Sequence, residues 1–381
     1  MFYLIRIYLI AVCLTVLVVS FAIAQKPDGS DLFVVIVDDK RGFIDQTGKI
    51  VIEPEWAGAN EFSEGRAQVT IEGDIYKIGF IDSLGKMIIP AEFDAAGDFY
   101  EGLVAVGVGR FGVHGEGDHK FGYVDYDGKI IIEKRFSEAK AFSGGLAAVA
   151  NEKGKWGYVN RTGELVIEHR FDDAFGFSEG LACVLKDGLF GFIDPNGKFA
   201  IEPKYLLPST FKEGLAAVKT GQLGQKPYKS YGAYIASDGL FQFIDKKGAT
   251  VFTLSGSVKR VNPYSEGLAL VGIETQRGFP YYGYIDKKGE FVIKPIYFGF
   301  ARDFSEGLAM VSVNDKHGFI DKTGKLIIRP AYSYGDNFKN GLARMEIGRS
   351  AADLKARAVY ITKTGRLVWT DAKRPKKIKR S

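Results

Sequence analysis

From residue 41 almost to the C-terminus, apolar residues occur in short runs that are separated by glycine-containing turns. A run such as Gly157-Tyr158-Val159-Asn160 is followed by a turn and then by a second apolar run, Leu165-Val166-Ile167. Aromatic and β-branched residues favour strands. No stretch after the N-terminus places apolar residues at helical spacing over several turns. The pattern predicts an all-β chain of short strands.

The same phrase, Gly-aromatic-Ile/Val-Asp-x-x-Gly, returns at intervals of about 34 to 51 residues, which is typical of repeat arrays. The Asp side chain accepts hydrogen bonds from backbone N–H groups two residues on, and glycine tolerates positive φ. We therefore expect a short hairpin loop with a bulge glycine, followed by a returning strand. Proline lacks the N–H group of a central strand, so we expect the returning strand to end at its proline. The copies begin at Gly42, Gly79, Gly122, Gly157, Gly191, Gln242, Gly283 and Gly318, with a weaker ninth at Val359, and the prolines are Pro54, Pro90, Pro203, Pro295 and Pro330.

A second phrase, Phe-Ser-Glu-Gly-Leu-Ala-x-Val, closes each unit, with clear copies that begin at Phe62, Phe177 and Phe304. Ser-Glu-Gly predicts a turn and Leu-Ala-x-Val the next strand. Each unit then has about three strands, with a short fourth around residues 171–174. The glutamates of this turn are expected to be solvated; they are Glu64, Glu101, Glu179, Glu213, Glu266 and Glu306.

Together these phrases resemble the WG-repeat family, also called the KWG-repeat family, of bacterial β-repeats. The resemblance covers residues 41–369, although the literal signature stands only at Lys155-Trp156-Gly157. It implies a β-propeller-like array of eight to nine three- or four-stranded units and a binding role without catalysis; an open β-solenoid is the alternative. The array begins and ends within a unit, and a closed ring could use these ends to complete one shared blade.

The N-terminus has the features of a targeting segment. Arg6 precedes an apolar run from Ile7 to Phe21, and Ala22-Ile23-Ala24 fits the small-x-small rule for cleavage after Ala24. We expect residues 1–24 to be a signal peptide and the protein to be secreted or periplasmic. The alternative is an uncleaved N-terminal membrane anchor.

Residues 25–372 form the predicted repeat domain, without a break in composition. Residues 373–381 form a basic tail that accounts for the net charge of +5 and is expected to be disordered. After cleavage Cys183 would be the only cysteine. It stands where other units have alanine, so we expect a small buried hydrophobe.

The sequence predicts no catalytic residue and no cofactor. It lacks G-x-S-x-G, P-loop and H-E-x-x-H motifs. His114, Glu116, Asp118 and His119 form one candidate metal cluster, but the surrounding glycines set no ligand geometry, so no metal is expected. No basic stripe crosses the repeats, which argues against nucleic acid as a partner.

Insertions point to the functional face, because all of them fall between Leu-Ala-x-Val and the next Gly-aromatic-Ile-Asp. In a ring, one slot of the repeat means one face. Exposed aromatic side chains in these loops would stack on sugar or peptide, although local packing is the alternative. The longer connections are residues 107–121, 219–241, 272–282 and 348–358, and the candidate ligand-binding residues are Tyr228, Tyr231, Tyr234, Phe279, Tyr281 and Tyr282.

These observations predict an exported, non-catalytic binding or scaffold protein. Loops on a rigid β frame would recognise an envelope or extracellular ligand, either a protein or a glycan. The alternative is a hydrolase of envelope polysaccharide on a propeller-like scaffold, which would need two convergent carboxylates in a pocket.

Overall fold

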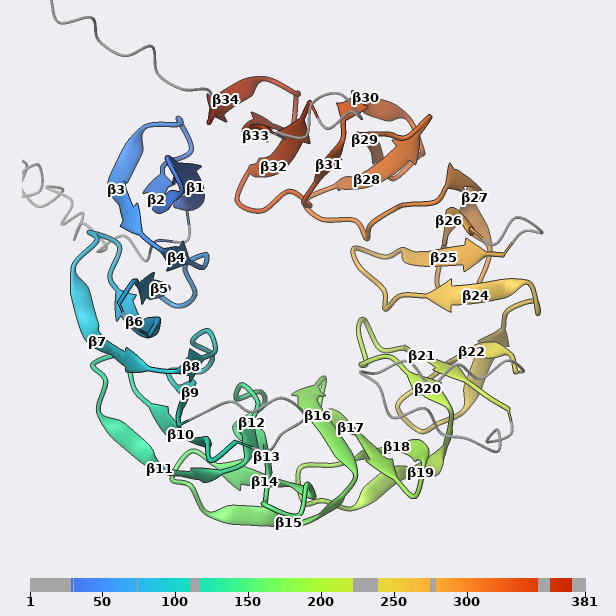
Figure 1. Ribbon diagram of the computed structural model, residues 1–381. Helices are drawn as coiled ribbons and strands as arrows, with labels where there is room; N and C mark the ends of the chain where they lie inside the picture. Colours follow the sequence, from blue (N-terminus) through green and yellow to red (C-terminus); the bar gives the residue numbers. More distant parts are fainter. Residues whose placement is uncertain are drawn as a thin grey trace, which may run out of the picture.

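The computed structural model describes residues 29, 31–73, 75–109, 117–221, 239–274, 279–348 and 357–371. In this part of the chain all regular secondary structure is β-strand, and there is no helix. The strands form nine antiparallel sheets that follow one another as blades around a ring (Figure 1). The predicted all-β propeller of three- or four-stranded units is confirmed. The predicted signal peptide and basic tail lie outside the described residues.

The nine blades take consecutive segments of the chain. Blade 1 contains β1 (Phe33–Val37), β2 (Lys40–Ile44) and β3 (Ile50–Trp56); blade 2 contains β4 (Gly58–Ala59), β5 (Ala67–Ile71), β6 (Lys77–Ile81) and β7 (Met87–Phe93). Blade 3 contains β8 (Ala95–Ala96), β9 (Val104–Val108), β10 (Lys120–Val124) and β11 (Ile130–Phe136); blade 4 contains β12 (Glu138–Ala139), β13 (Leu146–Ala150), β14 (Trp156–Asn160) and β15 (Leu165–Phe171). Blade 5 contains β16 (Asp173–Ser178), β17 (Leu181–Lys186), β18 (Leu189–Ile193) and β19 (Phe199–Tyr205); blade 6 contains β20 (Leu207–Pro208), β21 (Ala216–Lys219), β22 (Phe241–Ile244) and β23 (Thr250–Thr253). Blade 7 contains β24 (Val258–Val261), β25 (Ala269–Ile273), β26 (Tyr281–Ile285) and β27 (Phe291–Phe298); blade 8 contains β28 (Leu308–Val313), β29 (Lys316–Asp321) and β30 (Leu326–Tyr332); blade 9 contains β31 (Tyr334–Gly335), β32 (Leu342–Ile347), β33 (Arg357–Thr362) and β34 (Leu367–Thr370).

Within a four-stranded blade the strands pair in chain order. The short first strand lies towards the middle of the ring and the last strand on its periphery (Figure 1). We call the four positions the inner, second, third and outer strands. In blade 8 a single bridge between Ala301 and Val311 replaces the inner strand, and in blade 1 no inner strand lies within the described residues. The predicted short fourth strand is therefore the inner one.

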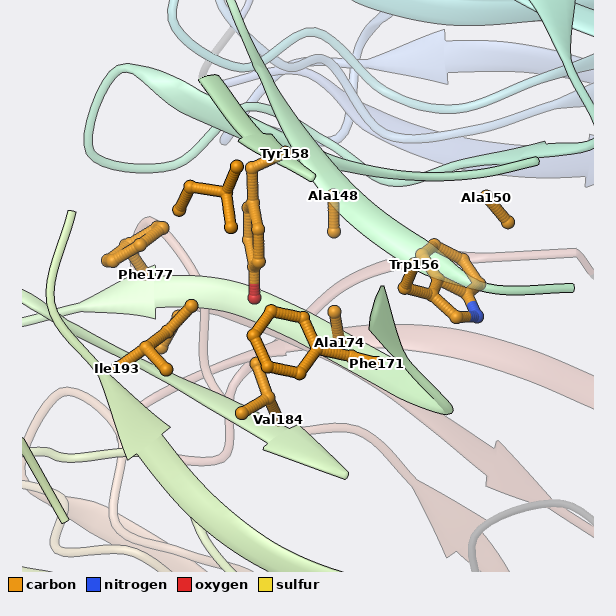
Figure 2. Close-up of a cluster of buried hydrophobic side chains, with 11 residues drawn as sticks. Ala148, Ala150, Trp156, Tyr158, Phe171, Ala174, Phe177, Val184 and Ile193 are labelled. Atoms are coloured by element: carbon orange, nitrogen blue, oxygen red, sulfur yellow. The ribbon is translucent and has the colours of Figure 1, made fainter. Parts of the chain in front are cut away.

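The core lies between blades. In Figure 2, Tyr158 of blade 4 packs with Phe177, Val184 and Ile193 of blade 5, all of them buried. The Tyr158 and Phe177 ring centroids are 5.2 Å apart. Equivalent aromatic pairs join successive blades from Phe43–Phe62 to Phe319–Phe338. Each unit thus buries its apolar side chains against its neighbours, as in other repeat arrays.

The glycine that opens each copy is required by the outer strand. In blade 5, Phe190 pairs with Tyr205 and Phe192 with Ile201, so three residues of β19 lie opposite Gly191. A Cβ atom on Gly191 would lie 2.7 Å from the Ile201 carbonyl oxygen. The outer strand therefore bulges over a position that has room only for glycine.

This bulge corrects the prediction that proline ends the returning strand. Pro203 lies within the bulge, and β19 continues past it to Tyr205. An outer strand has one neighbouring strand only, so a missing N–H group is tolerated there. Pro54, Pro90, Pro295 and Pro330 likewise lie inside β3, β7, β27 and β30.

The aspartate of each copy caps the following turn, as predicted. Asp45 Oδ1 accepts hydrogen bonds from the N–H groups of Thr47 (2.8 Å) and Lys49 (3.1 Å), and Gly48 has φ 86°. The bond to the Thr47 hydroxyl lowers the pKa of Asp45, against a smaller effect of burial. The recurring aspartates are thus explained by turn formation.

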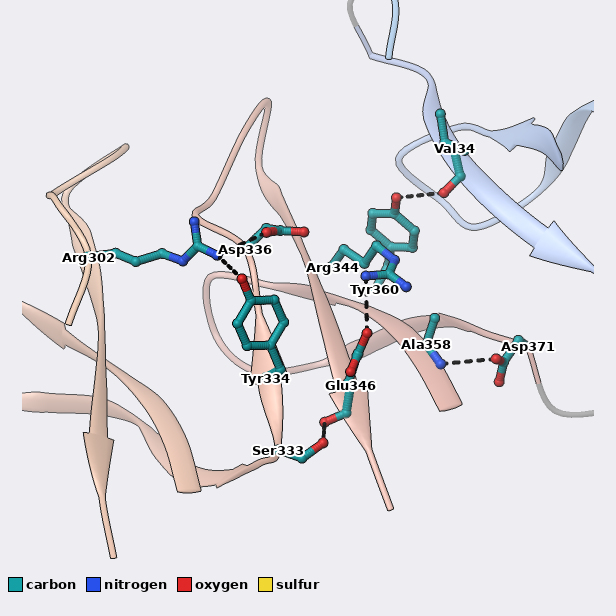
Figure 3. A network of polar contacts seen from close by, with 10 residues as sticks. All are labelled: Val34, Arg302, Ser333, Tyr334, Asp336, Arg344, Glu346, Ala358, Tyr360 and Asp371. Carbon is teal, nitrogen blue, oxygen red and sulfur yellow. Dashed lines mark hydrogen bonds and ion pairs between the residues drawn. The ribbon is translucent and has the colours of Figure 1, made fainter. Parts of the chain in front are cut away.

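The ring is closed by contacts between its first and last blades, which lie next to each other in Figure 1. The Tyr360 hydroxyl donates to the Val34 carbonyl oxygen at 2.7 Å (Figure 3), and the Tyr360 and Phe33 rings are 5.6 Å apart. Across the same junction, Gln46 Nε2 donates to the Asn340 carbonyl oxygen at 3.3 Å. The open solenoid is excluded. Each end of the described chain builds a blade of its own, so the ends do not complete a shared blade as we suggested.

Candidate functional site

The two faces of the ring differ, and hydrogen bonds between neighbouring blades define the first one. The Ser178 hydroxyl, in the turn between the inner and second strands of blade 5, donates to the Phe211 carbonyl oxygen of blade 6 at 2.6 Å. The same bond joins Ser63 to Phe99, Ser265 to Phe304 and Ser305 to Phe338. These turns therefore lie side by side on one face, which we call the stapled face.

The turn glutamates strengthen this face. Glu179 accepts a hydrogen bond from the Gly214 N–H (3.0 Å) and an ion pair from Lys246 (3.2 Å), both in the next blade. Partial burial opposes ionisation, but these two contacts prevail and lower the pKa of Glu179. The turn glutamates are exposed or half-buried, in line with the expectation that they are solvated, but their contacts to the next blade were not predicted. The equivalent hydrogen bond from a glycine N–H group of the next blade is accepted by Glu64, Glu101, Glu213, Glu266 and Glu306.

The insertions begin and end at the opposite face. Each second strand runs away from a stapled turn, so the connection to the third strand leaves at the far end of the blade. The pairs Val108–Lys120, Lys219–Phe241, Ile273–Tyr281 and Ile347–Arg357 mark the bases of the four longer connections. We call this the loop-bearing face.

The structure places the six candidate ligand-binding residues differently. Phe279 and Tyr281 are exposed at the base of one long connection, and both rings pack against Phe298, with centroids 6.0 and 5.2 Å away. Tyr282 is buried, and its hydroxyl accepts a hydrogen bond from Arg260 at 3.2 Å. The other three, Tyr228, Tyr231 and Tyr234, lie outside the described residues.

Beside Tyr282, a cavity of about 360 Å³ extends along the inner edge of blades 7 to 9. Its size falls within the range of about 300–1,000 Å³ that is usual for small-molecule sites. Polar side chains dominate its wall: Arg260, Asn262, Tyr282, Arg302, Asp303 and Asn337.

Arg302 is held from the side of blade 9. Its guanidinium donates to the Tyr334 hydroxyl at 2.8 Å and pairs with Asp336 at 3.3 Å, and it lies over the Tyr334 ring (Figure 3). Its Nε atom is buried without a hydrogen-bond partner, as is Oδ1 of Asn337. Two residues that line the cavity therefore carry one buried donor and one buried acceptor that are unsatisfied.

Asp303 provides the one carboxylate of this wall. Both of its oxygens accept from Asn262 Nδ2, at 2.9 and 3.1 Å. Burial raises the pKa of Asp303, although Asn262 and nearby cations oppose the shift. The Asn60–Asp98 pair repeats this contact between blades 2 and 3, so the Asn–Asp pair belongs to the repeat frame.

The cavity was not predicted from the sequence, although a signal was present. In the corresponding slot between blades 3 and 4 the wall contains Ala95, Gly97 and Ala139. Counting back from the aromatic residue before the turn, Arg260 occupies the position of Ala95, and Arg302 that of Gly97. Comparing inner strands with one another would have shown that these positions differ in charge from blade to blade.

Other candidates have structural explanations. Cys183 is buried as predicted, and burial raises the pKa of its thiol. His317 is buried against Phe300, with ring centroids 5.0 Å apart. His114 and Glu116 lie outside the described residues, and within the described ranges no three His, Cys, Asp or Glu side chains gather as metal ligands do.

Comparison with known proteins now identifies the repeat. The family model described as "WG containing repeat" matches residues 42–73, 78–109, 121–156, 156–190, 190–223, 282–316 and 318–349, which together make up more than half of the chain. The chain belongs to the WG-containing repeat family. The tryptophan of the WG signature, Trp156, begins the third strand of blade 4 and is buried beneath Lys140, whose Nζ lies 4.4 Å from the ring centroid.

Solved structures that resemble this WG-repeat ring are remote in sequence. One, titled "Crystal structure of the eukaryotic initiation factor", has a TM-score of 0.59 at 11% identity and covers 89% of this chain and 95% of its own. Another, BamB from Moraxella catarrhalis, has a TM-score of 0.40 at 13% identity, with 90% and 96% covered. At such identity the first match shows a shared fold only. No curated protein matches the chain.

The described part of this WG-repeat chain contains no helix that is long and apolar enough to cross a membrane.

Proposed function

We propose that this WG-repeat propeller is an exported, non-catalytic binding or scaffold protein, which recognises a protein or glycan of the cell envelope or the extracellular medium. One observation carries the proposal: the longer connections all leave from one face, while hydrogen bonds between blades tie the other face together. A rigid frame with variable loops on one side is a common arrangement for recognition.

Export is supported by the leader sequence at residues 1–24. A cleaved leader would place the ring in the periplasm or outside the cell, and a retained leader would tether it to the membrane. The hydrolase alternative gains nothing from the cavity, because its wall holds Asp303 as the one carboxylate and glycoside hydrolysis commonly needs two.

The test is capture of partners from an envelope extract. Immobilised wild-type protein is compared with a variant that lacks residues 221–230, in the longest connection of the loop-bearing face. The matched control, Lys247→Glu with Lys288→Glu, changes two turns between third and outer strands on the stapled face.

We expect wild type and the double variant to retain the same envelope protein or glycan, and the loop deletion to lose it. Equal retention by the deletion variant would contradict recognition through this loop. Loss in the double variant would place recognition on the stapled face instead.

A further inference from the structure

The slot between neighbouring inner strands allows blades to be compared within one molecule. Between blades 3 and 4 it is a cavity of about 270 Å³ lined mostly by alanine and glycine, including Ala95 and Gly97, together with Asp98 and Phe121. Between blades 7 and 8 the equivalent positions carry Arg260 and Asn262. Blade 3 therefore forms without a charged group at these positions. Where blades 4 and 5 carry charged groups there, Lys140 and Asp173 pair with each other at 2.9 Å, whereas Arg260 has no such partner among the described residues.

Arg260 is exposed, and within the described chain it forms no ion pair. Its guanidinium donates a hydrogen bond to the Tyr282 hydroxyl, which holds the side chain beside the cavity, and its charge opposes the rise in the pKa of Asp303. The remaining donors of the planar guanidinium can meet a carboxylate in two parallel hydrogen bonds. This arrangement favours an anionic group at the outer end of the cavity.

Two other residues that line the cavity have polar atoms that suit hydroxyl groups. Arg302 Nε is a buried donor and Asn337 Oδ1 a buried acceptor, both without partners. Leaving such a group unsatisfied costs about 1–3 kcal/mol. A hydroxyl both donates and accepts, and Asp303 beside them supplies a further acceptor.

The aromatic side chains complete the wall. Tyr334 is 40% exposed, and Phe300 stands beside it with ring centroids 6.2 Å apart. Both rings line the cavity. Aromatic rings of this kind offer an apolar surface to the C–H groups of a flat ligand, while a tyrosine hydroxyl keeps a polar contact.

We propose that the cavity of blades 7 to 9 binds a sugar acid, with Arg260 holding the carboxylate, Arg302 and Asn337 the hydroxyl groups, and Phe300 and Tyr334 the ring. The site takes one saccharide unit, and Tyr282 places it beside the base of a long connection. The proposal names a ligand class for the case in which the protein binds a glycan. It rests on the proposed function only in that both place binding at the loop-bearing face.

The test is direct binding of tetragalacturonate to purified protein by isothermal titration calorimetry, with its methyl ester as the neutral counterpart. We expect wild type to prefer the acid, and Arg260→Ala to weaken binding of the acid about tenfold or more, since a charge-assisted pair is removed. Arg260→Ala installs the residue type that blade 3 already carries as Ala95, so the fold is expected to persist.

The matched control is Lys259→Ala, which removes one positive charge from the adjacent residue, whose partner is Glu274 at 3.7 Å. It should leave the affinity unchanged. Asn337→Ala should weaken binding of the acid and of the ester by the same factor, because Asn337 is proposed to bind hydroxyl groups of the ligand and not its carboxylate.

The proposal fails if the acid and ester bind equally, if Arg260→Ala binds as wild type does, or if an acidic peptide of equal charge binds in place of the saccharide. These outcomes are independent of the envelope capture. Arg260→Ala leaves residues 221–230 intact, so loss of one result with survival of the other shows which proposal is wrong.

Discussion

At the scale of single residues, two positions of the repeat explain most of its local geometry. Gly191 and its equivalents accept the outer strand that bulges above them, and the aspartates three residues later fold the turn. Blade 6 shows the dependence directly. There Gln242 replaces the glycine, and β22 pairs with β23 through Gln242–Thr253 and Phe243–Phe252 without the bulge at that place.

We predict that Gly191→Ala lowers the free energy of unfolding by about 1–3 kcal/mol, because a methyl group would overlap backbone atoms of Ile201 and Pro203. Gln242→Ala is the control at the equivalent position and should change stability by about 0.5 kcal/mol or less. Chemical denaturation of both variants measures the difference. Equal stability of wild type and Gly191→Ala would show that the bulge does not require glycine.

The stapling glutamates are the second residue-scale feature. Glu179 has φ 52°, a left-handed conformation in which asparagine or glycine is usual. Such a backbone is strained for glutamate, so the contacts to Gly214 and Lys246 in the next blade are what favour this residue here.

The lowered pKa of Glu179 predicts a dependence on pH. Because the folded pKa lies below the ordinary 4.5, the stabilisation is complete above pH 4.5 and is lost as pH falls through the folded value. Glu179→Gln should therefore cost about 1 kcal/mol or less at pH 7, and progressively less as the pH falls below 4.5. Urea denaturation at pH 7, 5 and 3.5 tests this, and a cost that stays constant across these values would contradict it.

At the scale of elements, the two turns that flank β17 lie on opposite faces of the ring and differ in their contacts. The turn at Glu179-Gly180 is tied to the next blade, since Ser178 donates to the Phe211 carbonyl oxygen. The turn at Asp187-Gly188 leads into the loop-bearing face. Both pairs have positive φ, so the turns share their local backbone and differ in their surroundings.

We predict that insertion of Gly-Ser-Gly between Asp187 and Gly188 costs less than about 1 kcal/mol, because lengthening a surface loop carries a small entropic cost. The same insertion between Glu179 and Gly180 should cost about 1–3 kcal/mol, since hydrogen bonds between blades are broken. Thermal unfolding of the two variants makes the comparison. A larger loss from the first insertion would show that the faces are assigned the wrong way round.

The strands and turns could be predicted from the sequence, whereas most contacts between blades could not. Phrases such as Gly-Tyr-Val-Asn at 157–160 predicted the strands and turns, because strand propensity and turn chemistry are local. The role of Glu179 was missed because its partners lie in the next unit. The prediction that strands end at prolines such as Pro203 was wrong, because the bulge that accommodates the proline depends on the neighbouring third strand. The cavity of blades 7 to 9 was missed because three blades contribute to it.

At the scale of the whole molecule, ring closure buries the apolar faces of the first and last units. An open array exposes the apolar faces of its first and last units, whereas here Phe33 and Tyr360 pack against each other and Trp369 contacts Tyr360. Glu61 of blade 2 also reaches this junction, accepting from the Val34 N–H at 3.3 Å. The nine units therefore form one body, and the loops gain a common rigid support.

The most direct test of this account is a cross-link across the junction, in a background without native cysteines (Cys13→Ala with Cys183→Ala). Gln46→Cys and Asn340→Cys lie 294 positions apart in sequence and next to each other in the ring, and a short bismaleimide can join them. Glu306→Cys with Lys363→Cys is the positive control. The native side chains, Glu306 Oε2 and Lys363 Nζ, lie 3.0 Å apart between consecutive blades, and consecutive blades are neighbours in an open array as well as in a closed ring. The account predicts an intramolecular cross-link for both pairs in dilute protein, identified by mass spectrometry. Cross-linking of the control pair alone would contradict the closed ring.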